Sequence, residues 1–335
     1  MKSILTPALN PLLLPLLRIL SDGEFHSGEA LAQQFGVSRA SVWNALQAAQ
    51  DHGAVLHKVR GRGYRLPAAP DWLDAGVIEC GLGAYARDYH IHVAEYVGST
   101  NAELLRMAVA GAPHRSCLVA EIQHAGRGRR GRAWQSVVGG SLTASILWRF
   151  DTGIAALSGL SLAVGVALLR ALRQFGADKI QLKWPNDLLW HYRKLAGILI
   201  EVQGDVMGPS LAVIGIGINL QLPAAVRAEI DQAVTDLHEV CATPISRNQL
   251  LAALLIHLNA VMADFGQSGL LNLRAEWLAA HAYQDKPVRA LLANGSDQCG
   301  TAVGLSADGA LLLQTAGGEQ LALNGGEVHL TRRIA

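Results

Sequence analysis

The first 66 residues contain short segments whose hydrophobic positions recur at helical spacing, and then a basic hairpin. Ser27 and Ser38 stand where they can cap the second and third of these segments, which predicts three helices. Two short β-prone runs follow, separated by Arg60-Gly61-Arg62-Gly63. The expected elements are helices at 12–20, 27–35 and 38–50 and strands at 55–59 and 64–66.

Residues 75–280 alternate strand and helix patterns without an internal repeat. The predicted strands are 91–97, 117–123, 141–148, 180–184, 196–202 and 211–218, and the predicted helices are 101–110, 155–175, 248–265 and 271–280. Leu142–Trp148 partly alternates polar and apolar residues, so one face of that strand is expected to lie outside the core. This pattern predicts an α+β domain with a mixed sheet.

From Tyr283 the pattern changes to short strands that are broken by Gly, Asn and Asp turns, at 287–292, 299–305, 310–315 and 319–322. About fifty residues of this kind predict a small β-barrel. With Pro67–Pro70 as a linker, we expect three domains, at residues 1–67, 68–282 and 283–335.

The composition excludes several classes of protein. Half of the residues are hydrophobic and only 16% are charged, which is the opposite of a disordered chain. The net charge of +1 means that any site for a polyanion must come from a local cluster. The longest uncharged run, Ile154–Leu169, is short for a membrane span and predicts a buried helix and no membrane partner.

The spacing of the cysteines predicts where in the cell the protein is found. Cys80, Cys117, Cys241 and Cys299 lie tens of residues apart, without the grouped spacing of a disulfide framework or a zinc site. We therefore expect buried, reduced thiols, a cytoplasmic protein and no protein-bound metal.

The strongest local signal is the segment Gly126-Arg127-Gly128-Arg129-Arg130-Gly131-Arg132. Four arginines in seven residues repel one another, while the three glycines allow the backbone to approach a ligand closely. This composition favours a flexible loop that becomes ordered around a phosphate group. An exposed basic loop or an RNA-binding patch is the alternative, and a Walker loop is excluded because no Gly-Lys-Ser/Thr follows.

Two further segments carry charged groups that suit a nucleotide site. Lys183-Trp184-Pro185-Asn186-Asp187 gathers a cation, an aromatic ring, an amide and a carboxylate at a strand end, where Pro185 fixes the turn. Lys194 precedes the apolar run that begins at Leu195. Taken alone, this lysine could be an ordinary surface charge.

Two polar clusters at strand ends have both a functional and a structural interpretation. Ser99-Thr100-Asn101 offers two hydroxyls and an amide at a strand-to-helix junction, where a plain helix cap is equally expected. Gly215 and Gly217 precede Asn219 at the end of a strand. These glycines either allow the Asn219 amide to reach a ligand or allow the strand to pack tightly against its neighbours.

The N-terminal pattern resembles a winged helix–turn–helix DNA-binding domain. In such domains a recognition helix enters the major groove and a cationic wing contacts phosphate. A structural helical hairpin with a solvated basic turn is the alternative. The candidate DNA-binding residues are Arg39, Ser41, Asn44 and Gln47 on the helix and Lys58, Arg60 and Arg62 on the wing, beside Arg65.

Taken in order, these motifs resemble the bifunctional bacterial biotin protein ligases of the biotin operon repressor type, over essentially the whole chain. The resemblance implies a class II synthetase-like central sheet and an SH3-like C-terminal domain. In such ligases the carboxylate of biotin attacks the α-phosphate of MgATP, and a lysine of the biotin carboxyl carrier protein then takes the biotin from biotinyl-5′-adenylate. The substrates implied are biotin and ATP, with Mg²⁺ as counterion.

The resemblance also implies roles for single residues. Biotin would be held by Ser99, Thr100, Asn101, Gln123, Arg127, Gly128, Arg129 and Lys194. The catalytic charges would be Arg127, Arg129, Lys183, Asp187 and Lys194. ATP and the adenylate would be held by Arg130, Arg132, Trp134, Asn186 and Asn219.

Two positions depart from the pattern of these ligases, in which Asp commonly precedes Ser-Thr-Asn and a second Gln commonly follows the first. Gly98 and His124 stand at these positions here. Both lie beside the biotin motif without removing its principal donors, so they are expected to affect affinity more than activity.

The partners implied are operator DNA, the carrier protein and a second copy of the chain, which pairs with the first when the adenylate is bound. The alternative function is that of a monofunctional acyl-adenylate ligase, or of a lipoate or octanoyl transferase relative, with a structural N-terminal domain.

Overall fold

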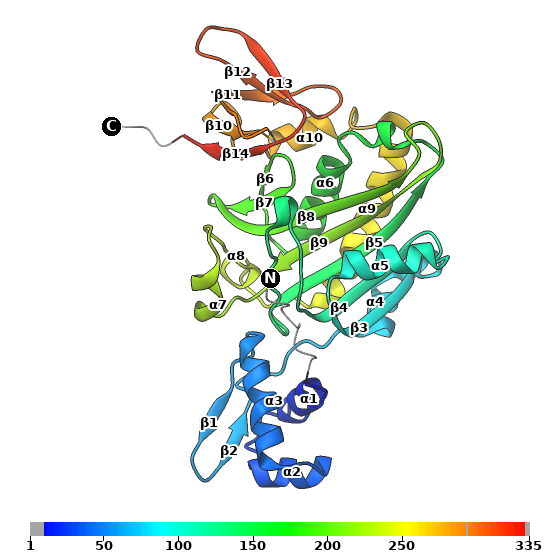
Figure 1. The fold of residues 1–335 in the computed structure, drawn as a ribbon. Coiled ribbons are helices and arrows are strands. Elements are labelled where there is room, and N and C mark those ends of the chain that lie inside the picture. The colour runs from blue at the N-terminus through cyan, green and yellow to red at the C-terminus, as the bar shows by residue number, and fades with distance from the viewer. Residues whose placement is uncertain (1–9, 293, 332–335) are drawn as a thin grey trace, which may run out of the picture.

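The computed structural model describes residues 10–292 and 294–331, and the chain folds into three parts along its length (Figure 1). A helical part lies at one end, a large sheet with helices occupies the middle, and a small β part lies at the other end. The predicted order of a helix–turn–helix part, a mixed-sheet part and a small β part is confirmed.

The N-terminal part is built from three helices and one hairpin. Its elements are α1 (Leu13–Leu20), α2 (Gly28–Phe35), α3 (Arg39–Asp51), β1 (His57–Val59) and β2 (Gly63–Arg65). Ser27 caps α2 and Ser38 caps α3, as expected. Gly63 has a φ of 106°, and a Cβ atom at this position would overlap the carbonyl of His26. A glycine is therefore required where the wing closes against the chain before α2.

The central sheet has seven strands in the order β3-β4-β5-β9-β8-β7-β6. Only the β3–β4 pair is parallel, and every other neighbouring pair is antiparallel. The strands are β3 (His90–Val97), β4 (Ser116–Gln123), β5 (Ser141–Phe150), β6 (Gln181–Lys183), β7 (Asp187–Trp190), β8 (Arg193–Gly204) and β9 (Ser210–Asn219).

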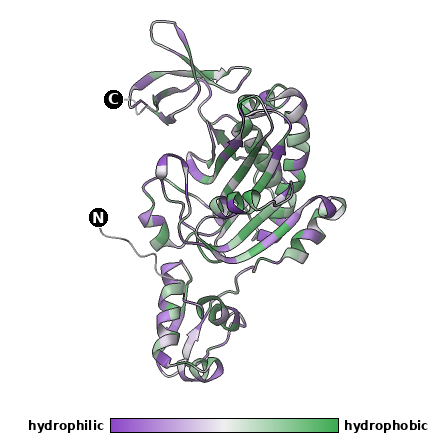
Figure 2. Ribbon diagram, turned by 45° about the vertical axis from the view of Figure 1, so that its right-hand side comes forward, coloured by the Kyte–Doolittle hydropathy of each residue, from purple (hydrophilic) through white to green (hydrophobic). Residues whose placement is uncertain are grey.

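Helices cover both faces of this sheet. The main core lies between one face and the helices α4 (Ala75–Leu82), α6 (Leu160–Arg173), α9 (Arg247–Ser268) and α10 (Arg274–Ala279). On the other face a smaller cluster packs α5 (Thr100–Val109) against β4, β5 and β9. Figure 2 colours most of the central strands and the helices behind them as hydrophobic. The α9 helix is long and apolar enough to cross a membrane by length and composition alone, but most of its residues are buried here in the core.

The C-terminal part is a five-stranded antiparallel sheet in the order β13-β12-β11-β10-β14. Its strands are β10 (Pro287–Leu291), β11 (Asp297–Leu305), β12 (Leu311–Gln314), β13 (Gln320–Leu323) and β14 (Glu327–Leu330). Short turns at glycine residues separate these strands, which agrees with the predicted small β domain.

Several elements differ from the sequence prediction. The helix expected from residue 155 begins only at Leu160, because Gly159 is left-handed (φ 79°) and a 3₁₀ turn, η3 (Ile154–Leu157), precedes it. The elements that were not predicted are α4, β7, β14, α7 (Ala224–Glu229), α8 (Leu237–Val240) and the 3₁₀ segments η1 (Gly83–Asp88) and η2 (Arg129–Gly131). The four cysteines are free, but Cys80 and Cys299 are exposed, so the expectation of buried thiols is wrong for these two.

A buried ion pair fastens the linker between the first two parts to the central sheet. Glu121 on β4 and Arg247 at the start of α9 are 1% and 0% exposed, and their side chains lie 2.8 Å apart. Glu121 Oε1 also accepts from the backbone N–H of Leu73 at 2.6 Å, and Arg247 Nε donates to the carbonyl of Asp71 at 2.8 Å. Both charges are therefore satisfied by the linker as well as by each other.

We expect Glu121→Gln to lower the free energy of unfolding of the central domain by about 3–5 kcal/mol, because it leaves the buried Arg247 without a counter-charge. Urea unfolding followed by tryptophan fluorescence measures this change. Asp297→Asn, which breaks the exposed Arg289–Asp297 pair, is the control and should cost less than about 1 kcal/mol. Equal losses in the two variants would contradict a structural role for the buried pair.

Candidate active site

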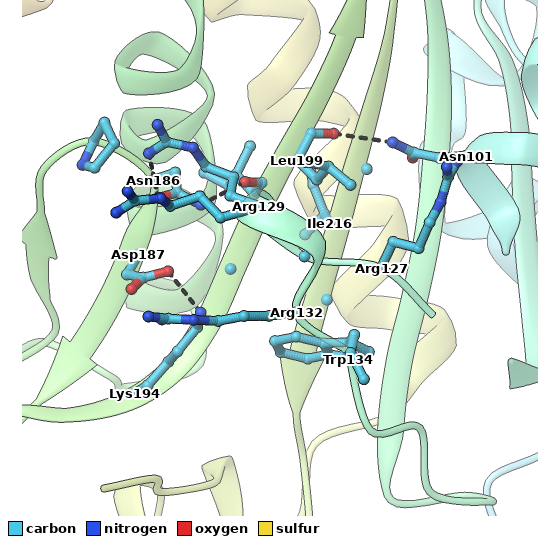
Figure 3. A pocket seen from close by; sticks show the side chains of 18 of the residues that line it. Asn101, Arg127, Arg129, Arg132, Trp134, Asn186, Asp187, Lys194, Leu199 and Ile216 are labelled. Carbon is cyan, nitrogen blue, oxygen red and sulfur yellow. Dashed lines mark hydrogen bonds and ion pairs between the residues drawn. The ribbon is translucent and has the colours of Figure 1, made fainter. Parts of the chain in front are cut away.

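One cavity brings together most of the residues singled out from the sequence. It lies on the α5 side of the central sheet, between the end of β4, the strands β8 and β9, and the β6–β7 turn (Figure 3). The predicted residues that line it are Ser99, Thr100, Asn101, Gln123, Arg127, Gly128, Arg129, Arg130, Arg132, Trp134, Lys183, Asn186, Asp187 and Lys194. Residues from five separate segments of the chain therefore meet at one place.

Glycines form the floor of this cavity. A Cβ atom at Gly217 of β9 would lie 2.5 Å from Cε2 of Trp134, and one at Gly197 of β8 would lie 3.5 Å from Cζ3 of the same ring. The indole therefore lies directly on Gly217, where a methyl group would overlap the ring, and at ordinary contact distance from Gly197. Gly215 makes room in the same way for Asn101, whose Oδ1 would be only 2.2 Å from a Cβ atom.

The hydroxyls and amides at one end of the cavity form a hydrogen-bonded cluster. Gln123 Oε1 accepts from the backbone N–H of Thr100 at 2.7 Å and from its hydroxyl at 2.9 Å. Ser145 Oγ, on β5, lies 2.7 Å from Thr100 Oγ1 and 2.6 Å from Asn101 Oδ1. Ser99 occupies the cap position of α5 but does not cap the helix with its side chain, so its hydroxyl is available to a ligand.

The charged end of the cavity is built from the β6–β7 hairpin and the start of β8. Lys194 Nζ lies 2.7 Å from Asp187 Oδ1, and Lys183 Nζ lies 3.5 Å from Asp187 Oδ2. The Lys194 contact does not have hydrogen-bond geometry, which leaves this buried oxygen with unused acceptor capacity. Lys194 also faces the ring of Trp134 at 5.8 Å. Its side chain is only 16% exposed, so the interpretation of Lys194 as an ordinary surface charge is wrong.

The arginine loop lies across the cavity as a narrow turn. Trp134 N donates to the carbonyl of Gly126 at 2.9 Å, and Gly128 N donates to the carbonyl of Arg132 at 2.7 Å. Arg130 adopts a left-handed conformation (φ 57°) at the tip. Residues of this loop line the cavity, whose volume of about 110 Å³ is less than the roughly 300 Å³ at the small end of ligand pockets.

Each arginine of the loop has a partner elsewhere in the protein. Arg127 pairs with Glu201 of β8 at 3.3 Å, and Arg129 Nη1 donates to Asn186 Oδ1 at 3.2 Å. The other two reach the C-terminal domain, where Arg132 lies 2.5 Å from Glu327 and Arg130 donates to the carbonyl of Leu292 at 3.2 Å. Glu327 belongs to β14 and also lines the cavity, and the sequence patterns did not single it out.

The electrostatics of the loop follow from burial and from these partners. Burial lowers the pKa of the Arg129 guanidinium, Asp187 raises it, the charge of Arg130 lowers it and Glu327 raises it. Burial opposes ionisation of Glu327, but its hydrogen bond to Arg132 and the nearby cations hold the pKa of this carboxyl below its usual value. A deprotonated Glu327 beside protonated arginines is therefore favoured at neutral pH.

Asn219 is the one predicted ligand-binding residue that does not line the cavity. Its side chain is 4% exposed, and Nδ2 donates to the carbonyl of Thr235 at 3.1 Å. The same Nδ2 lies 3.5 Å from the carbonyl of Lys194, so Asn219 links the chain between α7 and α8 to the start of β8. The backbone N–H of Lys194 adds a bond to the carbonyl of Ala233 at 2.8 Å. That its amide forms a wall of the adenine site stays a prediction.

The candidate DNA-binding residues lie on the N-terminal part, away from the cavity (Figure 1). Arg39, Asn44, Lys58, Arg60 and Arg62 are exposed, whereas Ser41 and Gln47 are half-buried. Ser41 Oγ lies 2.9 Å from Ser38 Oγ within the cap of α3, and Gln47 Nε2 lies 2.5 Å from Gln50 Oε1. Arg62 stacks over the ring of Phe25 at 4.3 Å, which steadies the wing.

Comparison with known proteins decides the family. Over 91% of its length this chain is 40% identical to the bifunctional ligase/repressor BirA of Salmonella typhimurium, of which it covers 93%. The chain belongs to the biotin protein ligase family. Residues 93–219 match the biotin/lipoate A/B protein ligase family, residues 13–65 an HTH domain, and residues 285–330 the biotin protein ligase C terminal domain.

Two further relatives agree with this assignment. The bifunctional ligase/repressor BirA of Escherichia coli K12 is 37% identical over 92% of this chain and 94% of its own length. A mutant of the Aquifex aeolicus biotin protein ligase, solved in complex with biotin, superposes with a TM-score of 0.63 at 26% identity, over 72% of this chain and 99% of that one.

The two departures from the pattern of these ligases lie against each other outside the cavity. A Cβ atom at Gly98 would be 3.6 Å from Cε1 of His124, in ordinary contact with the ring. The His124 ring stacks on Tyr96 with a centroid distance of 4.5 Å, and Tyr96 meets His52 of the N-terminal part edge-on at 6.3 Å. These residues form a contact between the domains and leave the hydroxyl and amide cluster in place.

We expect Gly217→Ala to displace the indole of Trp134 and to slow adenylate formation by about tenfold, since the added methyl overlaps the ring. A pyrophosphate-release assay measures this rate. Gly165→Ala on α6 is the control, because its added methyl would lie 3.4 Å or more from every neighbouring side chain. If the clash is the cause, Gly217→Ala combined with Trp134→Ala should be no slower than Trp134→Ala alone. Additive losses would place the defect elsewhere.

Proposed function

We propose that this protein is an ATP-dependent biotin protein ligase that forms biotinyl-5′-adenylate, transfers biotin to a lysine of the biotin carboxyl carrier protein, and represses transcription through its N-terminal domain. The observation that carries the enzymatic half is the single cavity, in which a cluster of hydroxyls and amides meets Lys183, Lys194, Asp187 and the arginine loop. Such a cavity suits an acyl acid at one end and a polyphosphate at the other.

The ring end of biotin would be held by the hydroxyl and amide cluster. Both hydrogen bonds from Thr100 use Oε1 of Gln123, which leaves the donor end of this amide for a ligand, beside the hydroxyl of Ser99. A site built from buried donors and acceptors discriminates strongly against ligands that lack the matching polar atoms. Asn101 and Gly128 complete this end of the cavity.

The charged end would carry out the first step. An oxygen of the biotin carboxylate attacks the α-phosphorus of ATP, the new oxygen–phosphorus bond forms, and the bond to pyrophosphate breaks. Arg129, Arg132, Lys183 and Lys194 are the cations placed to neutralise the negative charge that accumulates. Trp134 would form the wall for the adenine ring, with Arg130 and Asn186 beside the phosphates.

Magnesium would enter with the triphosphate. Asp187 and Glu327 are the two carboxylates among the described residues that line the cavity, and one buried oxygen of Asp187 lacks a hydrogen bond. Mg²⁺ in nucleotide sites is commonly held by one or two carboxylates together with the phosphates, so these residues fit. The ion would supply additional charge neutralisation at the phosphates.

In the second step the amine of the carrier lysine would attack the acyl carbon of the adenylate, an amide bond would form, and AMP would leave. Asp187 is placed to accept a hydrogen bond from that amine or to orient Lys183 and Lys194. Because the mixed anhydride hydrolyses in water, the loop that covers the cavity would protect it until the carrier arrives.

Lys194→Ala should reduce adenylate formation by about 10²-fold, because it removes a preorganised cation from the charged end of the cavity. Pyrophosphate release from biotin and ATP measures the rate. Lys179→Ala, which removes an exposed lysine before β6, is the control and should keep the wild-type rate. Unchanged adenylation in Lys194→Ala would remove this residue from the proposed machinery.

Repression would rest on the wing and on assembly. The proposed dimer forms when the adenylate is bound, and the seven-stranded sheet has an open edge at β3, where a second copy could pair. At the other end of the sheet, Leu182 of β6 already pairs with the chain at His281. A dimer presents Lys58, Arg60 and Arg62 twice to one stretch of DNA, so binding should be strongly salt-dependent. The proposed location is the cytoplasm.

Biotin together with ATP should tighten binding to the biotin-operon promoter of the organism that makes this protein, more than either does alone. The triple variant Lys58→Ala, Arg60→Ala, Arg62→Ala should lose this binding, and the slope of affinity against salt should fall by about one per lost phosphate contact. Gel-shift titrations at several salt concentrations measure both effects. The variant should still biotinylate the carrier, because the wing lies far from the cavity. Equal DNA affinity with and without adenylate would overturn the repressor half alone.

A further inference from the structure

Glu201 stands just outside the cavity and contacts two residues that line it. It lies on β8, on the same face of the strand as Gly197 and Leu199. Its Oε2 accepts from Asn101 Nδ2 at 2.8 Å, and its Oε1 lies 3.3 Å from Arg127 Nη2. This one carboxylate therefore joins the Ser-Thr-Asn segment to the first arginine of the loop, although 74 residues separate it from Arg127.

The contact with Asn101 holds Glu201 firmly. Asn101 is 3% exposed, and its Nδ2 donates to the carbonyl of Leu199 at 3.1 Å as well as to Glu201. Its Oδ1 lies 2.6 Å from the hydroxyl of Ser145. Both protons of this amide are thus used within the protein, so Asn101 supports its neighbours and has no donor left for biotin (Figure 3 shows the bond to Leu199).

The two ends of the arginine loop have different anchors. The tip is held by Asn186, by the carbonyl of Leu292 and by Glu327, which belong to the hairpin β6–β7 and to the C-terminal domain. Arg127, the first arginine, forms an ion pair with Glu201 alone among the described residues. Its backbone bridges to Ala133, so it lies at the base of the turn. Opening of the tip therefore leaves the base attached to the sheet.

We propose that Glu201 is a positioning residue, which anchors the base of the arginine loop through Arg127 so that the loop opens and closes about a fixed point. The effect on adenylate retention rests on the proposed function. The anchor itself is a property of the ligand-free protein and does not depend on that function. Arg127 then acts mainly as a tether and not as a phosphate ligand, which refines the role that the resemblance implied for it.

The substitution Glu201→Gln isolates the charge. Glutamine keeps an oxygen that accepts from Asn101, while its NH₂ group would face the guanidinium of Arg127 with no acceptor between them. The fold and the hydroxyl and amide cluster should therefore survive while the tether is lost. Glu103→Gln is the matched control, because Glu103 lies on α5 two residues from Asn101 and, among the residues that the structure describes, pairs only with the exposed Arg106.

Limited trypsin digestion of the ligand-free protein tests the anchor. Cleavage after Arg129, Arg130 and Arg132, located by mass spectrometry, should be about three- to fivefold faster in Glu201→Gln, which is the range expected for loss of a partly exposed ion pair. Thermal unfolding should be unchanged. An unchanged cleavage rate, or faster cleavage at every tryptic site together with a lower unfolding temperature, would overturn the proposal.

The release rate of preloaded biotinyl-5′-adenylate tests the link to function. It should rise by a similar factor in Glu201→Gln and in Arg127→Gln, and the double variant should be no worse than either single variant, since both remove one tether. If Arg127→Gln is far worse and the losses add, Arg127 binds ligand directly and the proposal fails. If cleavage accelerates but the wild type forms no adenylate, the anchor stands and the proposed ligase function fails.

Discussion

Mutual repulsion among four arginines in seven residues is the constraint around which the rest of the structure is arranged. Unpaired, these charges would oppose the loop conformation that covers the cavity. The protein resolves this by giving each guanidinium an acceptor outside the loop: Arg127 pairs with β8, Arg129 with the β6–β7 turn, and Arg130 and Arg132 with the C-terminal domain. The loop is thus a junction of the central sheet with the C-terminal domain. A polyanion that binds there must replace some of these internal partners.

Close approach is the second requirement, and it is met by glycines at the floor of the cavity. Trp134 packs on the sheet only because Gly217 carries no side chain, and Asn101 fits only because Gly215 carries none. The polar face of β5 contributes in the same way, since its small hydroxyl at Ser145 supports Thr100 and Asn101 without filling the space. The glycines and the small hydroxyl in these strands therefore shape the floor of the cavity.

Local chemistry explains which parts of this arrangement the sequence could predict. Helix caps at Ser27 and Ser38, the arginine loop and the Lys-Trp-Pro-Asn-Asp turn all depend on residues adjacent in the chain, and they lie where the patterns placed them. Glu201 and Glu327 were missed because their partners are 74 and 195 residues away and nothing in their own neighbourhood marks them. The contact of Asn219 with Thr235 could not be predicted either, since its glycine-rich strand does not show which way the amide turns.

Strand β4 is where the docking of the N-terminal part and the proposed biotin site meet. Glu121 of this strand forms the buried ion pair with Arg247 that holds the linker, and Gln123 belongs to the hydroxyl and amide cluster. His124, just beyond the end of the strand, stacks on Tyr96, which contacts His52. The backbone N–H of Val138, after the loop, donates to the carbonyl of His52 at 3.1 Å, so the chain leaving the cavity also contacts the residue that ends α3. A ligand that reorders Gln123 or the loop therefore acts on segments that directly contact the DNA-binding domain. These direct contacts are the shortest physical route in the fold between the cavity and the N-terminal part.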